Sequence, residues 1–598
     1  MMTNRIRKIR NVFCASAAAL ALHACATTPT RVLTADDLLD APYALSAGAP
    51  FDVDAMFAAL PQWVAVNHGP AVFDAALGAM VVSDLRIALA SAPDSVVIAE
   101  RAVIWGGDPD AAQAVFSGGA SLADMTLLFD RLLLEGVRSE GLQWETGTEN
   151  ASLSIGKLVV DGLSARSYAL EEKAGANEEG AILRNVAAVM GSFAYDGAAY
   201  SDFALRLNNS QGDNVELNVA EAFSRGYDAG AVDYQSARGV YALIEGFGED
   251  PFVEVAARRE PEATASNPYA KILNKPPAET VTEMIRRPAA FLAGAVGAAA
   301  REYEIDLAEV RGADMRGAYA WLARWELPPI TETEIVDLGS QVLAGYRESW
   351  NGRPVYAVER VEIAAADFYW LVPSQYDVAY RGLTYDMGLM LEEMRNGMAP
   401  GLSTEAAPQL EQFRAALTAL GLERITGDMD MSWRWDGDTG AAALSMSSDF
   451  AGVAAGAFGV RAGGPSLARW DAMARDETLA ATAVGEISLQ GLNYSVTDKG
   501  LLGRAFAYAA AQNGAGSGPE LRQSVSAMIR LSSLQAGEMN PRIAGYAKAL
   551  ADFLERGGTL SLLAAPSAPV SLLALQAASQ GAPETLPDIL NVTLTHTE

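Results

Sequence analysis

Residues 428–435 read Asp-Met-Asp-Met-Ser-Trp-Arg-Trp, and this stretch predicts the fold more clearly than any other part of the chain. Its odd-numbered positions are apolar and its even-numbered positions polar, which is the period of a strand with one face against an apolar layer. An Asp-Gly turn follows within residues 436–440, and Leu444 and Met446 return on one face. A slip of one residue would turn both tryptophans to the opposite face, so the sequence predicts a hairpin of fixed register.

The same alternation recurs on both sides of this hairpin, mixed with segments of helical period. Asp-Gly pairs at 161–162 and 196–197 and the Asn-Gly pair at 351–352 predict further hairpin turns. Residues 331–349, 383–394 and 407–420 have the pattern of helices, and an apolar helical stripe over residues 543–554 ends at a Gly-Gly pair. We therefore expect an α+β fold, in which antiparallel, hairpin-rich sheets are packed by helices.

A chain of 598 residues predicts more than one domain. Residues 258–280 contain four prolines without any apolar period and form the best candidate for an interdomain linker. We predict an N-terminal α+β domain over residues 50–257 and a C-terminal α+β domain over residues 281–598. The two halves resemble each other in organisation, but no fixed repeat period demonstrates a duplication.

Composition excludes several classes of function. The formal net charge of −30 disfavours nucleic acid and anionic lipid headgroups as general partners, and it favours solubility. The cysteines are Cys14 and Cys25, and the chain has three histidines. A zinc site of Cys and His ligands and a cysteine nucleophile are therefore not expected, and we predict no cofactor and no bound metal.

The first thirty residues form an export signal. Four basic residues precede a short apolar run, which is too short to span a bilayer. Residues 22–25, Leu-His-Ala-Cys, resemble the lipobox of a bacterial lipoprotein. The resemblance implies that residues 1–24 are removed, that Cys25 carries the lipid anchor and residues 25–49 form a flexible tether. Ala26 after the cysteine resembles the class sorted to the outer membrane. Cleavage after Ala26 would instead release a soluble periplasmic protein.

Two residue groups are candidates for a site. The four aspartates of the hairpin, Asp428, Asp430, Asp436 and Asp438, could bind calcium, although two lie on a solvent face and two in a turn. The other group is two tryptophan pairs. Trp321 and Trp325 are spaced for one helical face, and Trp433 and Trp435 share a strand face, so core packing or an apolar groove could explain them.

The C-terminal part, from Tyr494-Ser495-Val496-Thr497-Asp498 to Gly557-Gly558-Thr559-Leu560, resembles uncharacterised proteobacterial envelope proteins. Together with the 428–446 hairpin it also resembles the AsmA-like and YdgA-like envelope families. This likeness covers at most the last 180 residues and carries over no catalytic residue. It implies a role beside lipid in the envelope.

From these features we expect a non-catalytic lipoprotein at the periplasmic face of the outer membrane, acting in envelope maintenance, scaffolding or lipid handling. Its partners would be the membrane, through the anchor, and lipid or envelope proteins, but no nucleic acid. The alternatives are a periplasmic hydrolase that uses carboxylates alone and a soluble periplasmic binding protein.

Overall fold

The structure is a computed structural model of the chain. It describes residues 35–39, 48–60, 64–89, 92–116, 124–141, 150–168, 178–208, 214–245, 300–324, 328–369, 372–397, 400–476, 479, 483–514 and 516–598. The described residues form two compact units, which lie within Met1–Arg258, Ala298–Pro328 and Glu334–Gly352 for unit 1, and within Pro329–Thr333 and Arg353–Glu598 for unit 2.

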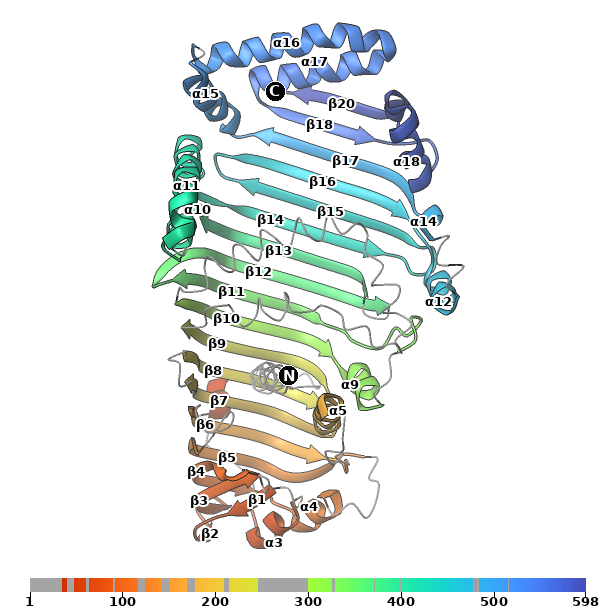
Figure 1. Cartoon of the computed structure of the whole chain (residues 1–598). Coiled ribbons are helices and arrows are strands. Elements are labelled where there is room, and N and C mark those ends of the chain that lie inside the picture. The colour runs from red at the N-terminus through yellow and green to blue at the C-terminus, as the bar shows by residue number, and fades with distance from the viewer. Residues whose placement is uncertain are drawn as a thin grey trace. The chain divides into compact units, whose positions relative to one another are not determined.

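Unit 1 is built around one antiparallel sheet. Its strands are β1 (Val64–Asn67), β2 (Ala71–Asp74), β3 (Ala79–Leu89), β4 (Ala92–Trp105), β5 (Thr126–Glu140), β6 (Asn150–Ala165), β7 (Phe193–Asn208), β8 (Asn214–Asp228), β9 (Ala231–Glu245), β10 (Arg301–Asp314) and β11 (Gly339–Trp350). From β3 to β11 each strand pairs with the next one in the chain (Figure 1). The short strands β1 and β2 both pair with β3.

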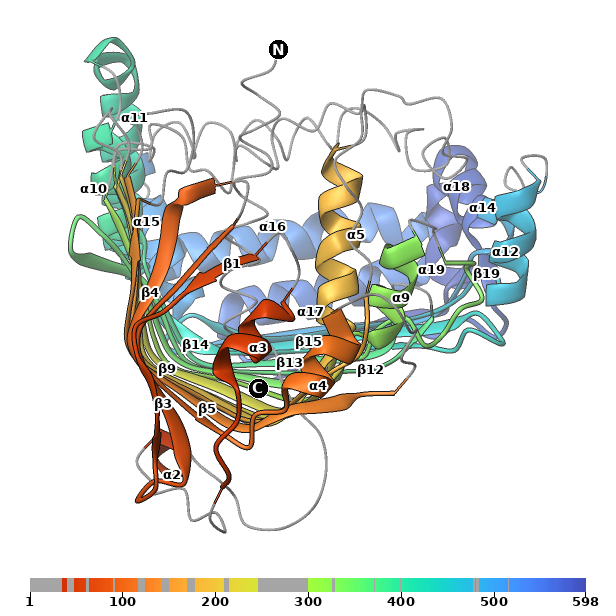
Figure 2. The ribbon, with the colours of Figure 1, turned by 90° about the horizontal axis from the view of Figure 1, so that it is seen from below.

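A line of backbone kinks crosses this sheet. Asp84, Gly136, Asp202, Gly239 and Gly345 have φ of 48°, 61°, 55°, 59° and 64°, and the ladder is interrupted at each of them without a change of register. A positive φ turns the strand and reverses the alternation of side chains, because the pleat is broken there. Figure 2 shows that the strands of unit 1 bend strongly.

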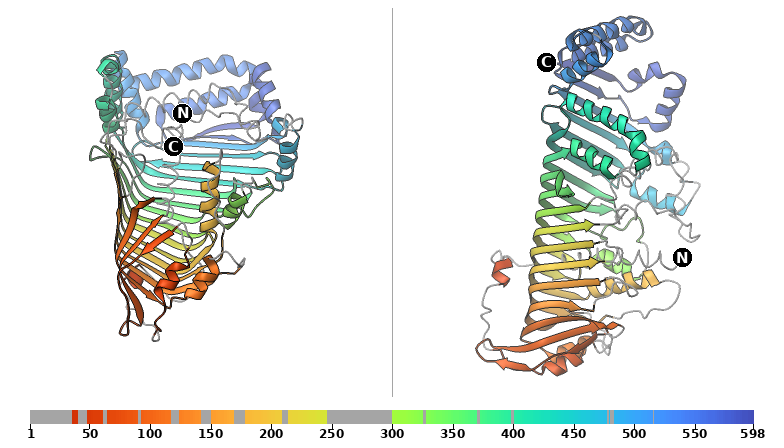
Figure 3. Two further views of the ribbon diagram at one scale, coloured as in Figure 1. Left: turned by 60° about the horizontal axis from the view of Figure 1, so that its bottom comes forward. Right: turned by 60° about the vertical axis from the view of Figure 1, so that its left-hand side comes forward.

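Short helices cover parts of both faces of the unit 1 sheet. α3 (Val53–Ala58) and α4 (Pro109–Phe116) pack on one face, in a core that includes Val82 and Ala102 of the sheet. α2 (Ala35–Leu39) packs against Val159, Ala199 and Phe223 on the other face (Figure 3, right). α5 (Glu178–Met190) and α9 (Arg316–Arg324) contact each other at one end of the strands.

Unit 2 contains a second antiparallel set of strands. These are β12 (Arg353–Tyr369), β13 (Val372–Asp386), β14 (Arg424–Trp435), β15 (Ala441–Phe450), β16 (Ala454–Gly463), β17 (Ser488–Asp498), β18 (Thr559–Ala564), β19 (Val570–Ser571) and β20 (Val592–Thr597). Neighbours in the chain pair from β12 to β18, β19 pairs with the far end of β17, and β20 pairs with β18.

The helices of unit 2 lie mainly at the ends of its strands and along one edge (Figure 1). At the strand ends are α10 (Met387–Gly397), α11 (Pro400–Leu420), α12 (Leu467–Arg475), α14 (Ala483–Glu486), α15 (Leu501–Asn513), α18 (Leu572–Gly581), the 3₁₀ turn η1 (Pro583–Thr585) and α19 (Leu586–Ile589). α16 (Gly518–Met539) and α17 (Pro541–Arg556) pack together, and α17 lies against β18 and β20.

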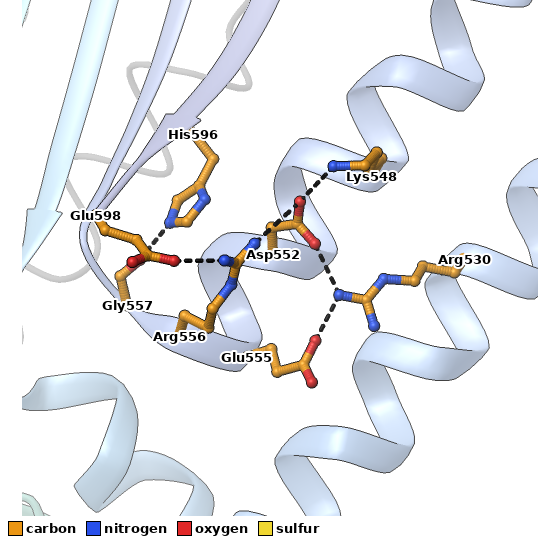
Figure 4. A network of polar contacts seen from close by, with 8 residues as sticks. All are labelled: Arg530, Lys548, Asp552, Glu555, Arg556, Gly557, His596 and Glu598. Carbon is orange, nitrogen blue, oxygen red and sulfur yellow. Dashed lines mark hydrogen bonds and ion pairs between the residues drawn. The ribbon is translucent and has the colours of Figure 1, made fainter.

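A polar network fastens α17 to α16 and to the end of the chain (Figure 4). Asp552, whose side chain is 10% exposed, accepts hydrogen bonds from Lys548 Nζ at 2.8 Å and from Arg530 at 2.7 Å. Arg556 pairs with Asp552 at 3.3 Å and with Glu598. These interactions lower the pKa of Asp552 to about 2, because hydrogen bonds stabilise the carboxylate form. The hydrogen bond from Lys548 has the largest effect and that from Arg530 the next largest.

The expected α+β fold is wrong, because antiparallel strands predominate throughout the described chain. A helix was expected over residues 331–349, but residues 339–349 lie in the strand β11. The Asp-Gly pairs at 161–162 and 196–197 lie inside β6 and β7 and do not form hairpin turns. Gly162 has φ of 64° within its strand, so the signal for a positive φ marks a bend in a long strand instead of its end.

Some other predictions are confirmed by the structure, and some concern residues that the structure does not describe. The 428–446 hairpin is confirmed as β14 and β15, with Trp433 opposite Leu444 and Met431 opposite Met446. Asn351 and Gly352 form a turn, with φ of 51° and 74°. Residues 1–24, Cys25 and the predicted linker at 258–280 lie outside the described residues, and β10, α9 and β11 group with unit 1. Among the helices that the structure describes, none is long and apolar enough to cross a membrane.

Candidate functional site

The most distinctive surface of unit 2 is one face of its sheet, across which apolar side chains continue from strand to strand. The registers place them directly opposite one another in sequence from β12 to β20. The first such row consists of Ile363, Val378, Met431, Met446, Phe458, Tyr494, Leu562 and Leu594. No member of this row is charged.

A second apolar row runs beside the first on the same face, two residues further along each strand. It consists of Ala365, Tyr376, Trp433, Leu444, Val460, Leu492, Ala564 and Val592. Trp435 begins a shorter third row, in which it pairs with Ala442. We call the two long rows together the apolar face of unit 2. Seven spacings of about 4.8 Å give each row a length of roughly 34 Å.

The opposite face of the same strands is polar. Between the two apolar rows in sequence lies the cross-strand series Asp377, Ser432, Ser445, Gly459 and Asn493, which ends at Ala364 on β12 and at Leu563 on β18. Surface ion pairs also lie on this face, among them Arg381 with Asp430 at 2.5 Å. The sheet of unit 2 therefore separates an apolar side from a hydrophilic side.

The apolar face is only partly covered. Of its sixteen side chains, three are buried, namely Ala365, Val378 and Ala564, and two of these are alanines. Met446 is 37% exposed and Tyr494 is 46% exposed. In unit 1, by contrast, Val82 and Ala102 are fully buried beneath α3 and α4. A continuous apolar surface that stays accessible to solvent is typical of a binding surface for lipid or another apolar partner.

The predicted tryptophan site is only partly assembled. Trp433 belongs to the apolar face and Trp435 to the third row on the same side of the sheet. The Trp433 indole N–H donates to the Pro373 carbonyl at 3.0 Å. The Trp435 ring packs edge-on against Tyr369 at 5.4 Å. Trp321 belongs to α9 in unit 1, where the Arg324 guanidinium lies over its ring at 4.1 Å, and Trp325 lies outside the described residues.

Sequence reasoning missed most of the face. Phe458 and Val460 lie in the stretch Ala454–Gly463, whose alanines and glycines have weak strand propensity. Tyr494 and Leu562 lie in segments that the sequence did predict as strands, but their shared face depends on register. Only the pairing of β16 with β17 and of β17 with β18 brings these four residues together.

The hairpin aspartates do not converge on a metal site. Asp428 accepts a hydrogen bond from the Gly382 N–H at 2.9 Å, and Asp430 pairs with Arg381. Asp436 accepts from the backbone N–H groups of Asp438 and Thr439, and the hydrogen bonds of Thr439 and of this turn lower its pKa. Within the described ranges, no group of three or more His, Cys, Asp or Glu side chains could hold a metal ion.

One carboxyl group has a raised pKa, as a general acid would. Burial raises the pKa of Asp161 to about 6, against the opposing effect of Arg131, whose Nε lies 3.0 Å away. Arg131 is itself 4% exposed and donates to the Leu38 carbonyl at 2.6 Å, so this pair holds α2 on the sheet. The geometry gives Asp161 a structural role.

The fold and its face place this chain among antiparallel β-sheet proteins that present an apolar sheet surface to solvent. The comparisons add one likeness. The model of a family described as an uncharacterized protein matches residues 437–597, which include β15 to β20 and five members of each apolar row. No curated protein matches the chain.

Proposed function

We propose that this protein is an exported, lipid-anchored protein of the bacterial cell envelope that binds the acyl chains of lipid on the apolar face of unit 2. The observation that carries this proposal is the pair of apolar rows across eight strands, whose side chains remain partly accessible. Each row, at roughly 34 Å, exceeds the roughly 15 Å of one leaflet's hydrocarbon layer, so it can hold an extended acyl chain.

The sequence supports the location. The lipobox-like residues 22–25 would place three acyl chains on Cys25, and Ala26 favours the outer membrane with the body in the periplasm. The likeness of the C-terminal part to AsmA-like and YdgA-like envelope families points to the same setting. The role we propose is non-catalytic: the protein holds or passes lipid, or acts as a scaffold beside it.

Acyl-chain binding follows from the physical chemistry of the face. Transfer of apolar surface out of water contributes about 25 cal/mol for each Å² that is buried, so a hydrocarbon chain laid along the rows gains free energy over its whole length. Met431 and Met446 form a cross-strand pair near the middle of the first row. Their unbranched, polarisable side chains can adapt to ligands of differing shape.

A matched pair of variants tests the proposal. Met446→Glu puts a carboxylate on the apolar face, whereas Ser445→Glu puts the same charge on the opposite face of the same strand. Mass spectrometry of lipid bound to the protein purified from membranes should show strong loss for Met446→Glu and wild-type content for Ser445→Glu. Equal lipid content in both variants, or no bound lipid in the wild type, would overturn the proposal. A bound water-soluble small molecule would favour a periplasmic binding protein.

A further inference from the structure

An open pocket of about 410 Å³ lies in unit 2 where β13 to β17 come close to their ends. Gln375, Arg434, Ala443, Arg461 and Gln490 contribute to its lining, together with Trp435. Gln375, Arg434, Ala443 and Arg461 have the strand parity of the polar face, whereas Trp435 belongs to the short third row on the other side. None of the sixteen residues of the two long apolar rows lines the pocket.

Strand register explains why the surface is hollow here. Gln375, Arg434, Ala443, Arg461 and Gly491 lie directly opposite one another on five successive strands. The long side chains of Arg434 and Arg461 therefore flank the small side chain of Ala443, and Gly491 lies on the next strand. Arg434 and Arg461 are two strand spacings apart, or roughly 9.6 Å between backbones, and the Arg461 guanidinium lies beside Gly491 of β17.

The charges in the pocket are unequally satisfied. Arg434 makes a bidentate pair with Asp377, at 2.7 and 2.8 Å. Within the part of the chain that the structure describes, the side chains of Arg461 and Gln490 have no hydrogen-bond or ion-pair partner. Asp436 also lines the pocket, but its oxygens accept hydrogen bonds from Asp438 and Thr439 in its own turn.

We propose that this pocket binds a phosphate group, either of a lipid headgroup or of a soluble phosphate ester. The planar guanidinium of Arg461 presents paired N–H donors that match two phosphate oxygens, and the Gln490 amide supplies a further donor. Arg434, whose charge is balanced by Asp377, lines the pocket on the other side of Ala443. In a chain of net charge −30, a guanidinium without a carboxylate partner is a local site of attraction for an anion. This inference does not rest on acyl-chain binding at the apolar face.

Calorimetric titration of the full-length protein tests the site, with inorganic phosphate as one probe and dihexanoyl phosphatidic acid below its micellar concentration as the other. Arg461→Gln should weaken phosphate binding about tenfold or more, because it removes charge-assisted hydrogen bonds. Arg424→Gln is the matched control, since it removes the same charge from the other end of β14, outside the pocket. It should bind like the wild type.

The two probes distinguish the sources of phosphate. Similar affinity for both indicates a site for soluble phosphate esters, and tighter binding of phosphatidic acid indicates a lipid headgroup. Unchanged affinity in Arg461→Gln, or no binding of either probe at millimolar concentrations, would refute the site. Met446→Glu should retain phosphate binding, so a failure of the proposed acyl-chain function is distinguishable from a failure of this pocket.

Discussion

Replacement of Asp552 by asparagine should weaken the C-terminal edge of unit 2 in a way that depends on pH. The carboxylate joins Lys548 and Arg556 of its own helix to Arg530 of α16 (Figure 4). Its pKa falls from 3.8 to about 2 in the folded protein. At about 1.4 kcal/mol per pKa unit, this shift corresponds to on the order of 2–3 kcal/mol at neutral pH.

Solvent reduces that figure. Asp552 is 10% exposed, but the side chains of Arg530 and Lys548 are 40% and 74% exposed, so water and salt screen the attraction. We therefore expect Asp552→Asn to lower the free energy of unfolding by about 2 kcal/mol at pH 7. Because folding depresses the pKa, this stabilisation is complete above about pH 4 and is lost as the pH falls through about 2.

The assay is urea unfolding read by hydrogen exchange and mass spectrometry on peptides from α17 and β20, which reports this region separately from unit 1. Wild type and Asp552→Asn should differ most at pH 7 and converge near pH 2. Glu411→Gln breaks a surface pair in which Glu411 and Arg395 are 56% and 40% exposed, and it should cost about 0.5 kcal/mol or less. A wild-type stability for Asp552→Asn at pH 7, or a difference that does not change with pH, would refute the reasoning.

Three further results are expected. Cys25→Ser should release the protein from the outer membrane while leaving the body folded, and continued pelleting after a salt wash would contradict the lipobox interpretation. On α16, Ser526 is fully buried and Leu531 is 70% exposed. In thermal melts, Ser526→Leu should therefore lower the free energy of unfolding by about 1–3 kcal/mol, and Leu531→Ser by about 0.5 kcal/mol or less. Trp433→Ala should cost about 2 kcal/mol, less than the 3–5 kcal/mol of a fully buried indole, and a melt unchanged from wild type would show that the indole packs against nothing.

The hairpin at 428–446 shows which structural features could be predicted from the sequence alone. Strict alternation and an Asp-Gly turn are local properties, so residue types alone predicted both strands and the shared face of Trp433 and Trp435. Helices with a strong apolar stripe and a glycine stop, such as α17, were also predictable. The same local reasoning failed for residues 339–349, which lie in β11 and pair with β10, because tertiary pairing overrode helical propensity.

The Asp-Gly pair inside β6 shows a second limit. Gly162 adopts a φ of 64° in the middle of its strand, and a glycine of positive φ serves a turn or a mid-strand bend equally well, so only the neighbouring strands decide which one forms.

By itself, then, the sequence determined the acidic, cysteine-poor character of the chain and the strands that alternate strictly between apolar and polar residues. The tertiary structure decided what those strands build. Phe458, Tyr494 and Leu562 are far apart in the chain and become neighbours only through the registers of β16, β17 and β18. Arg434 and Arg461 likewise flank Ala443 only through pairing with β15. Register is set by the hydrogen bonds between neighbouring strands, and no single strand specifies it. Neither proposed binding surface could therefore be predicted in full from the sequence.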